Sequence, residues 1–139
     1  MELPLCLTRL KPSKLHRGGV GVFAIVPIKK DQIIFDINGL SQTEVPKSVV
    51  KNLPKAVQKM YTDFAMQQVQ DNVHNAPCNF HDMGMYWYVC HSGKPNCVYV
   101  NSHGYIARRS IKPGEELSVD YREWDKDHHH VGDIKYKRK

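Results

Sequence analysis

The sequence predicts a mainly β domain of small sheets with one inserted helix, and three observations support that prediction. Short runs of β-branched and aromatic residues recur along the chain, Gly and Pro residues separate them, and a single segment has a helical period. Strands do not alternate with helices, which argues against a parallel sheet of the dinucleotide-binding type. The length of 139 residues suits one domain with its own core.

Three strands are expected before the helix. Leu3 to Leu10 is apolar-rich and is expected to form the first, ahead of a polar loop from Lys11 to Arg17. The β-branched runs at residues 20–24 and 33–37 follow, with turn residues from Pro27 to Gln32 between them. This arrangement predicts that the two runs pair as neighbouring strands.

The helix is expected to begin at Pro54, because a first helical position has no use for the N–H that proline lacks. One face then repeats at the i, i+3, i+4, i+7 spacing through Val57, Met60, Tyr61, Phe64 and Gln68. The helix is expected to fade near residues 71–75, and residues 46–53 are expected to add a short turn before it.

Strands return after the helix. Residues 98–100 and 105–107 flank a four-residue connection that ends in Gly104, which predicts a β-hairpin. Pro113 and Gly114 fit the two central positions of a type II turn, and residues 117–119 are expected to form the next strand.

Composition limits the class of protein. Twenty Lys and Arg against fourteen Asp and Glu give a net charge of +6, and 41% hydrophobic with 24% charged residues is ordinary globular usage. No apolar stretch approaches the ~18–20 residues of a membrane span, and the start of the chain lacks the basic region of a secretion signal. We expect a soluble intracellular protein with four reduced thiols, at Cys6, Cys78, Cys90 and Cys97.

No metal site is expected. The spacing His74-x3-Cys78-x2-His81 is a partial zinc pattern, but it has no convincing fourth ligand. The run His128 to His130 lies near the C-terminus and is expected to be a solvated part of the tail.

Three clusters could carry chemistry. Residues 18–24 (GGVGVFA) contain a Gly-x-Gly, which lets backbone approach a ligand closely, although the same pattern is typical of a tight turn. Residues 86–97 (YWYVCHSGKPNC) and 106–121 (IARRSIKPGEELSVDY) hold His91 and Tyr121, which taken singly could be a core histidine and a half-buried strand aromatic. The adjacent Glu115 and Glu116 are not an acid/base pair, because neighbouring strand positions face opposite ways.

The order and separation of these clusters resemble the SET domain, the family of S-adenosylmethionine-dependent protein lysine methyltransferases. The first is similar to its G-x-G-x-F-A strand, the second to its N-H-S-C-x-P-N-C segment, and the third to its I-x-A-x-R-x-I-x-x-G-E-E-L-x-x-D-Y ending. The resemblance spans residues 7–124 and is closest to minimal, stand-alone members. It implies a SET-like domain at residues 1–125, a substrate-binding insert at about 46–74 and a flexible basic tail at 126–139.

The resemblance implies a SET-type fold of small curled sheets in which a C-terminal pseudoknot brings His91 and Tyr121 together. Tyr121 would stand where the methyl group of S-adenosylmethionine is transferred, and His91 would hold the adenine through main-chain bonds. Cys90 stands at the cofactor-binding position where the family has asparagine. Three further residues would present backbone to the cofactor: Gly19, Val20 and Gly21.

Methyl transfer to lysine needs aligned reactants and a neutral amine, and demands no dedicated carboxylate base. A tyrosine oxygen suits this chemistry because it can accept a weak C–H···O contact from the polarised methyl. Aromatic side chains would line the lysine channel, with Tyr61, Phe64, Tyr86, Tyr88 and Trp124 as candidates. For Tyr61 and Phe64, a place in a helix's own core is the alternative.

Three positions depart from the family pattern: Cys90 replaces asparagine, Trp87 a common arginine, and Gly93 a cysteine. The asparagine amide normally binds the charged amino-acid end of the cofactor, whereas a thiol is a weak donor and acceptor, so reduced cofactor affinity is expected. A degenerate SET-like binding module without activity is therefore the alternative to a methyltransferase.

The expected partner is a protein or peptide with a target lysine, histones being one candidate class, and the resemblance also allows a homodimer. The basic run Lys135 to Lys139 could contact phosphate backbones. The rest of the domain has no nucleic-acid motif, so we expect a solubilising terminus and neither a nucleic acid nor a membrane as partner.

Overall fold

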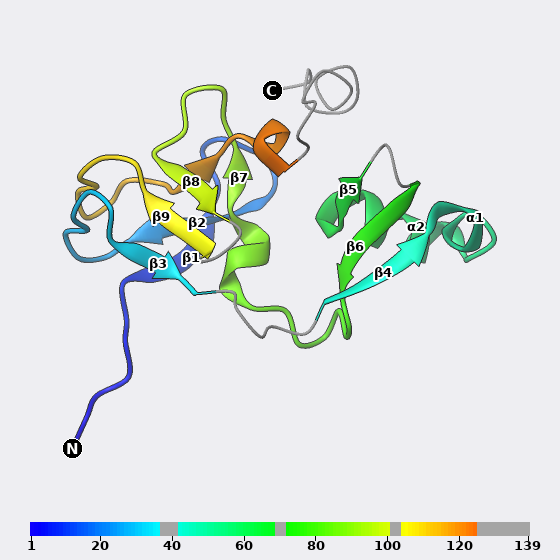
Figure 1. The fold of residues 1–139 in the computed structure, drawn as a ribbon, viewed down its shortest axis with the longest axis horizontal. Helices are drawn as coiled ribbons and strands as arrows, with labels where there is room; N and C mark the ends of the chain where they lie inside the picture. Colours follow the sequence, from blue (N-terminus) through cyan, green and yellow to red (C-terminus); the bar gives the residue numbers. More distant parts are fainter. Residues whose placement is uncertain (37–41, 69–71, 101–103, 125–139) are drawn as a thin grey trace.

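The computed structural model describes residues 1–36, 42–68, 72–100 and 104–124, which form two lobes (Figure 1). We call the larger lobe the frame; it contains residues 1–36 and the described residues from 84 onward. The smaller lobe, the insert, contains the described residues of 42–77. The chain therefore leaves the frame once, builds the insert, and returns.

Two sheets of the frame are antiparallel. β1 (Thr8–Pro12) pairs with β2 (Val20–Ala24) along the whole length of both strands. β9 (Gly104–Ala107) lies between β3 (Ile33–Phe35) and β8 (Cys97–Val100) in a three-stranded sheet. Strands this short and a mainly β content confirm the predicted class of fold.

A short parallel pair joins two distant stretches of the frame. β7 (Cys90–His91) lies beside β10 (Ser118–Val119), with Cys90 opposite Ser118. The 3-10 helix η1 (Met85–Tyr88) precedes β7, and a second one, η2 (Tyr121–Trp124), follows β10. The pairing confirms that the His91 and Tyr121 segments meet.

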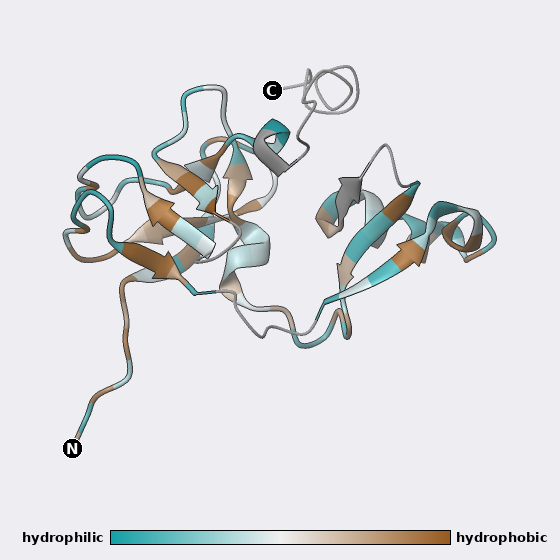
Figure 2. Cartoon of the chain, in the orientation of Figure 1, coloured by the Kyte–Doolittle hydropathy of each residue, from teal (hydrophilic) through white to brown (hydrophobic). Residues whose placement is uncertain are grey.

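The core of the frame lies between these sheets. Burial raises the pKa of Cys97 to about 12, so this core thiol stays neutral. In Figure 2 the hydrophobic colour is concentrated in the frame, whereas β4 and β6 of the insert are mostly hydrophilic. Seven large core side chains are each less than 2% exposed: Val22, Phe23, Ile28, Cys97, Ile111, Leu117 and Val119.

The predicted pairing of residues 20–24 with 33–37 is wrong, because β2 pairs with β1 and β3 pairs with β9. The chain between them crosses to another sheet instead of turning back. Ile28 and Ile111 exchange backbone hydrogen bonds of 2.9 and 2.8 Å, and the Asp31 N–H donates to the Ala107 carbonyl at 2.8 Å. The first strand also begins later than predicted, at Thr8.

The predicted hairpin is confirmed by the antiparallel pairing of β8 and β9, with Val98 opposite Ile106. Gly104 has a φ of 92°, a conformation that glycine adopts without strain, while residues 101–103 lie outside the described residues. Gly114 also has a φ of 92°, as a type II turn requires at its third residue, and its N–H donates to the Ala24 carbonyl.

The insert contains a sheet that the sequence did not predict. β4 (Gln42–Pro46) and β5 (Met66–Gln68) both pair antiparallel with β6 (Val73–Pro77), which lies between them. Two helices, α1 (Lys47–Val50) and α2 (Lys55–Phe64), connect β4 to β5. The longer of them, α2, is the predicted inserted helix, and the four-residue α1 lies within residues 46–53, where a short turn was expected.

The long helix α2 begins directly after Pro54, close to the predicted start. It ends at Phe64, however, and not near residues 71–75. Ala65 has an extended backbone, and the next three residues pair with β6, Met66 opposite Asn75. Local helix propensity is therefore overridden by a tertiary strand pairing.

Within the described ranges, no helix has the length and hydrophobicity that crossing a bilayer requires. Residues 125–139, which include the run His128 to His130 and the predicted basic tail, lie outside those ranges.

Candidate functional site

A cavity of about 810 Å³ lies between the frame and the insert. One wall is formed by the loop before β2 and by the first residue of β2, and a second wall by the end of α2. The remaining lining residues come from η1, β7 and the start of η2. Small-molecule sites typically measure ~300–1,000 Å³, so the volume suits a ligand of that class. The lining residues are Leu15, His16, Arg17, Gly18, Gly19, Val20, Lys59, Thr62, Asp63, Phe64, Trp87, Tyr88, Cys90 and Tyr121.

Six of the predicted site residues line this cavity: Gly19, Val20, Phe64, Tyr88, Cys90 and Tyr121. They come from the two parts of the frame that precede and follow the insert in the sequence and from the insert itself, so folding gathers them from far apart. Gly21, His91 and Tyr61 are not among the lining residues. Trp124 belongs to η2, but its side chain lies outside what the structure describes.

His91 and Tyr121 meet through backbone and side chain. The Tyr121 N–H donates to Nδ1 of His91 at 3.1 Å, and the two ring centroids are 5.3 Å apart. A nitrogen that accepts in this way carries no proton, which leaves the proton of a neutral ring on Nε2. The buried His91 thus holds the start of η2 in place.

The hydroxyl of Tyr121 donates to the carbonyl of Val89 at 2.6 Å. A phenol has one proton to donate, so with that proton committed it can meet a further group only as an acceptor. Tyr121 therefore presents an oxygen with acceptor character at the cavity.

Cys90 is 6% exposed and contacts three polar groups of the protein. Its sulfur lies 3.4 Å from Oγ of Ser13 and 3.6 Å from the carbonyls of Val20 and Tyr88. The thiol thus lies at the cavity wall and is engaged with the loop, where an asparagine amide would offer stronger donors and an acceptor.

Aromatic rings line the cavity on both sides of the gap between lobes. Phe64 of α2 packs edge-on against Tyr88 of η1, with centroids 5.6 Å apart, and Trp87 lies beside them in the lining. Tyr61 instead packs on His74 and Phe80, at 5.7 and 5.1 Å, within and beside the insert.

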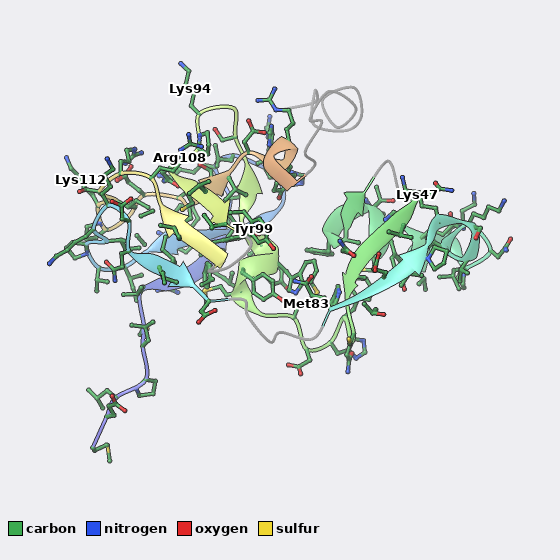
Figure 3. The ribbon with its side chains drawn as sticks, in the orientation of Figure 1. Lys47, Met83, Lys94, Tyr99, Arg108 and Lys112 are labelled. Atoms are coloured by element: carbon green, nitrogen blue, oxygen red, sulfur yellow. The ribbon has the colours of Figure 1, made fainter. Side chains whose placement is uncertain are left out.

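Two further aromatic residues extend the core rather than the cavity. Tyr86 is 8% exposed and its ring lies 6.3 Å from that of Tyr105. Burial raises the pKa of Tyr105 well above its ordinary value, so its hydroxyl stays protonated. In Figure 3, Tyr99 lies on the side of the frame toward the insert, and Met83 lies on the connection between the two lobes.

A polar loop was predicted at Lys11 to Arg17 and Gly19 was predicted to bind the cofactor, but no site residue was assigned within the loop, although Leu15, His16 and Arg17 line the cavity. The Glu116 carboxylate accepts hydrogen bonds from Oγ of Ser13 at 2.6 Å and from the backbone N–H groups of Lys14 and Leu15 at 2.7 and 3.2 Å. Glu115 faces the other way and accepts from Arg109 at 2.9 Å. Adjacent glutamates thus serve different loops, as their positions predict.

The Glu116 carboxylate leaves no room for a side chain at position 21, where the sequence has glycine. A Cβ at this position would lie 2.3 Å from Oε2 of Glu116, and that oxygen is held by its bonds to the loop. The second glycine of the Gly-x-Gly therefore makes room for Glu116, and it is buried.

Asp120 lies next to Tyr121 and pairs with Arg122. The carboxylate accepts from Nε and Nη2 of Arg122 at 2.8 and 2.6 Å, and its Oδ1 is 3.7 Å from Nδ1 of His91. Desolvation tends to raise the pKa of Asp120, but the hydrogen bonds and charge of Arg122 outweigh it, and the pKa lies below its ordinary value. Asp120 is therefore ionised at neutral pH.

In the described part of the chain, no three His, Cys, Asp or Glu side chains gather as metal ligands. His74 is buried beside Tyr61, while Cys78 and His81 are exposed. Figure 3 shows the half-buried Lys47 on the insert and the exposed basic residues Lys94, Arg108 and Lys112 on the frame.

Comparison with known proteins identifies the family. The sequence profile of the SET domain matches residues 19–122, whereas no curated protein matches the chain. Among solved structures, a Plasmodium falciparum protein described as a candidate histone methyltransferase has a TM-score of 0.54 at 20% identity, covering 85% of this chain and 95% of its own. The methyltransferase domain of human PR domain-containing protein 2 has a TM-score of 0.53 at 23% identity, covering 81% of this chain and 74% of its own. Fold and profile agree, and the chain belongs to the SET-domain family.

Proposed function

We propose that this chain is a protein lysine methyltransferase that uses S-adenosylmethionine. The observation that carries the proposal is the acceptor oxygen of Tyr121 at a cavity bordered by the Gly-x-Gly loop and by aromatic rings. Membership of the SET-domain family, whose structural relatives are methyltransferases, supports the same activity.

The cavity residues fit such a cofactor in size and in chemistry. Residues 15–20 line one wall, and Trp87 and Tyr88 bring aromatic rings to the lining that suit contact with a flat ring or a cation. Arg17, Lys59 and Asp63 supply charges of both signs for an amino-acid end that is itself a zwitterion. When bound, S-adenosylmethionine supplies an activated methyl group on a sulfonium.

The chain's own residues then have two tasks. The Tyr121 oxygen, with its proton held by Val89, accepts a C–H···O contact and orients the incoming amine. Phe64 and Tyr88 exclude water, which disfavours the charged ammonium and lowers the pKa of the lysine amine from ~10.4. Neither task needs a carboxylate base.

A binding module without activity is the second candidate, and Cys90 favours it. Its thiol contacts Ser13 and two protein carbonyls and offers a ligand little hydrogen bonding. Such a module would keep the fold and a protein partner while it lost affinity for the cofactor.

The deciding experiment is methylation of intact histones and of lysine peptides by the purified chain. Release of S-adenosylhomocysteine together with a methyl-lysine mass increment supports the proposal. A protein that neither binds S-adenosylmethionine at millimolar concentration nor methylates any substrate supports the binding module instead. Histones are the first substrate class to test, since one structural relative is described as a candidate histone methyltransferase.

A further inference from the structure

We infer that Glu116 is a positioning residue for cofactor binding, which holds the loop at residues 13–19 in its binding shape; this inference rests on the proposed function. The loop gives one wall of the cavity, from Leu15 to Val20. Glu116 itself is not among the lining residues, so its effect on a ligand passes through the loop.

The loop lies at the surface of the frame. All five residues from Lys14 to Gly18 are exposed, so hydrophobic burial contributes little to their order. Hydrogen bonds order the loop instead. The Glu116 carboxylate accepts three, from Ser13 Oγ and the N–H groups of Lys14 and Leu15, at 2.6, 2.7 and 3.2 Å.

Ser13 extends this anchorage along the loop. Its Oγ accepts from the N–H groups of Leu15 and His16 at 3.1 and 2.8 Å, and its own N–H donates to the Gly19 carbonyl at 3.0 Å. The Gly19 N–H donates back to the His16 carbonyl at 2.9 Å. The bond between Ser13 and Gly19 therefore joins the two ends of the loop, and Glu116 holds Ser13 in place.

The same short segment sets both sides of the cavity. Glu116 ties the loop, and five residues later Tyr121 bonds to Val89. Asn96 fixes the backbone of this segment, because its side chain donates to the Glu116 carbonyl at 2.9 Å and accepts from the Ser118 N–H at 2.8 Å. Because Asn96 and Val89 hold this segment separately from the loop, loosening the loop is expected to leave Tyr121 in place.

The test compares Glu116→Gln with Glu115→Gln. Both variants remove one carboxylate charge from neighbouring positions, but Glu115 binds Arg109 and Lys112 away from the cavity. Glu116→Gln is expected to weaken binding of S-adenosylhomocysteine, measured by calorimetry, about tenfold, because glutamine replaces an acceptor with a donor. Its KM for the cofactor should rise while kcat at saturating cofactor stays within about twofold. Glu115→Gln should leave affinity unchanged.

A second readout needs no cofactor. Lys14 and Arg17 are trypsin sites within the loop, and a loosened loop is cut faster. Glu116→Gln should speed cleavage at both sites severalfold, and Glu115→Gln should not. If Glu116→Gln does not fold, Ser13→Ala decides, with about threefold weaker binding and faster cleavage expected.

Wild-type affinity and wild-type cleavage rates in the Glu116→Gln or Ser13→Ala protein would overturn the inference. If the wild-type chain does not bind S-adenosylhomocysteine, the proposed function fails. The trypsin comparison then still decides whether Glu116 holds the loop.

Discussion

Replacing Tyr121 by phenylalanine separates the chemical role of the phenol from its structural role. The variant keeps the ring beside His91 and removes the 2.6 Å hydrogen bond to Val89. Loss of one such bond costs about 1 kcal/mol of folding free energy, which lowers Tm by about 3–4 °C in a chain of 139 residues. The fold should therefore survive.

The expected effect on turnover is larger than the effect on folding. Under the proposed function, the phenol oxygen would supply one C–H···O contact and one hydrogen bond to the amine, together about 2 kcal/mol. That energy corresponds to about a 30-fold lower kcat.

The assay is release of S-adenosylhomocysteine at saturating cofactor and peptide, with cofactor affinity measured separately. Tyr105→Phe is the matched control, because Tyr105 is a core tyrosine of β9 that does not line the cavity. Tyr105→Phe should turn over at the wild-type rate. A Tyr121→Phe protein with lowered Tm but undiminished kcat would refute the assignment and leave Tyr121 a structural residue.

Three further predictions test the site and the core. Cys90→Asn should tighten S-adenosylmethionine binding about tenfold, because an amide adds a bond to a charged group; Cys90→Ser is the control of similar size, and weaker binding by Cys90→Asn would refute the reasoning. The pKa of Asp120 is lower in the folded than in the unfolded chain, so its stabilisation is present above the ordinary value of 3.8 and is lost as the pH falls further. In thermal melts, the difference in Tm between wild type and Asp120→Asn should therefore be largest at pH 7 and should shrink below pH 3.8. A Tm difference that does not change with pH would contradict this prediction. Leu117→Ala should lower the free energy of unfolding by about 3 kcal/mol and Tm by about 10 °C, since Leu117 is fully buried. Leu5→Ala, at an exposed position, should change neither quantity, and equal Tm values for the two variants would exclude Leu117 from the core.

Local signals predicted the parts of the fold that depend on local chemistry. Pro54 marked the start of α2, and Gly104 and Gly114 marked turns that need a positive φ. The end of α2 could not be predicted in this way. Residues 66–68 have no strong strand signal of their own, and they become a strand because β6 offers an unpaired edge.

The site depended on contacts that span most of the chain. Ser13 and Glu116 are 103 positions apart, and nothing near either residue indicates the other. The meeting of His91 with Tyr121 was expected only from the resemblance to a family, since a two-residue parallel pair has no pattern that a sequence can reveal.

Helical spacing also left one question open that the fold answers. Tyr61 and Phe64 are three residues apart and share a face of α2, so periodicity treats them alike. Tyr61 lies against β6 and packs on His74, whereas Phe64, one turn further, reaches Tyr88 across the gap between lobes. Whether an aromatic residue of α2 packs within the insert or lines the cavity therefore depends on where the frame lies, which helical spacing does not indicate.

The antiparallel pairing of β4 with β6 places Gln42 directly opposite Pro77, so the excursion starts and finishes at nearly one point. A chain segment whose two ends coincide can be exchanged as a cassette, because a tight turn between those ends would leave the remaining domain undisturbed. Replacement of residues 42–77 would exchange the cavity wall that contains Lys59, Asp63 and Phe64 and keep the wall that the frame supplies, which is a route for ligand preference to diverge.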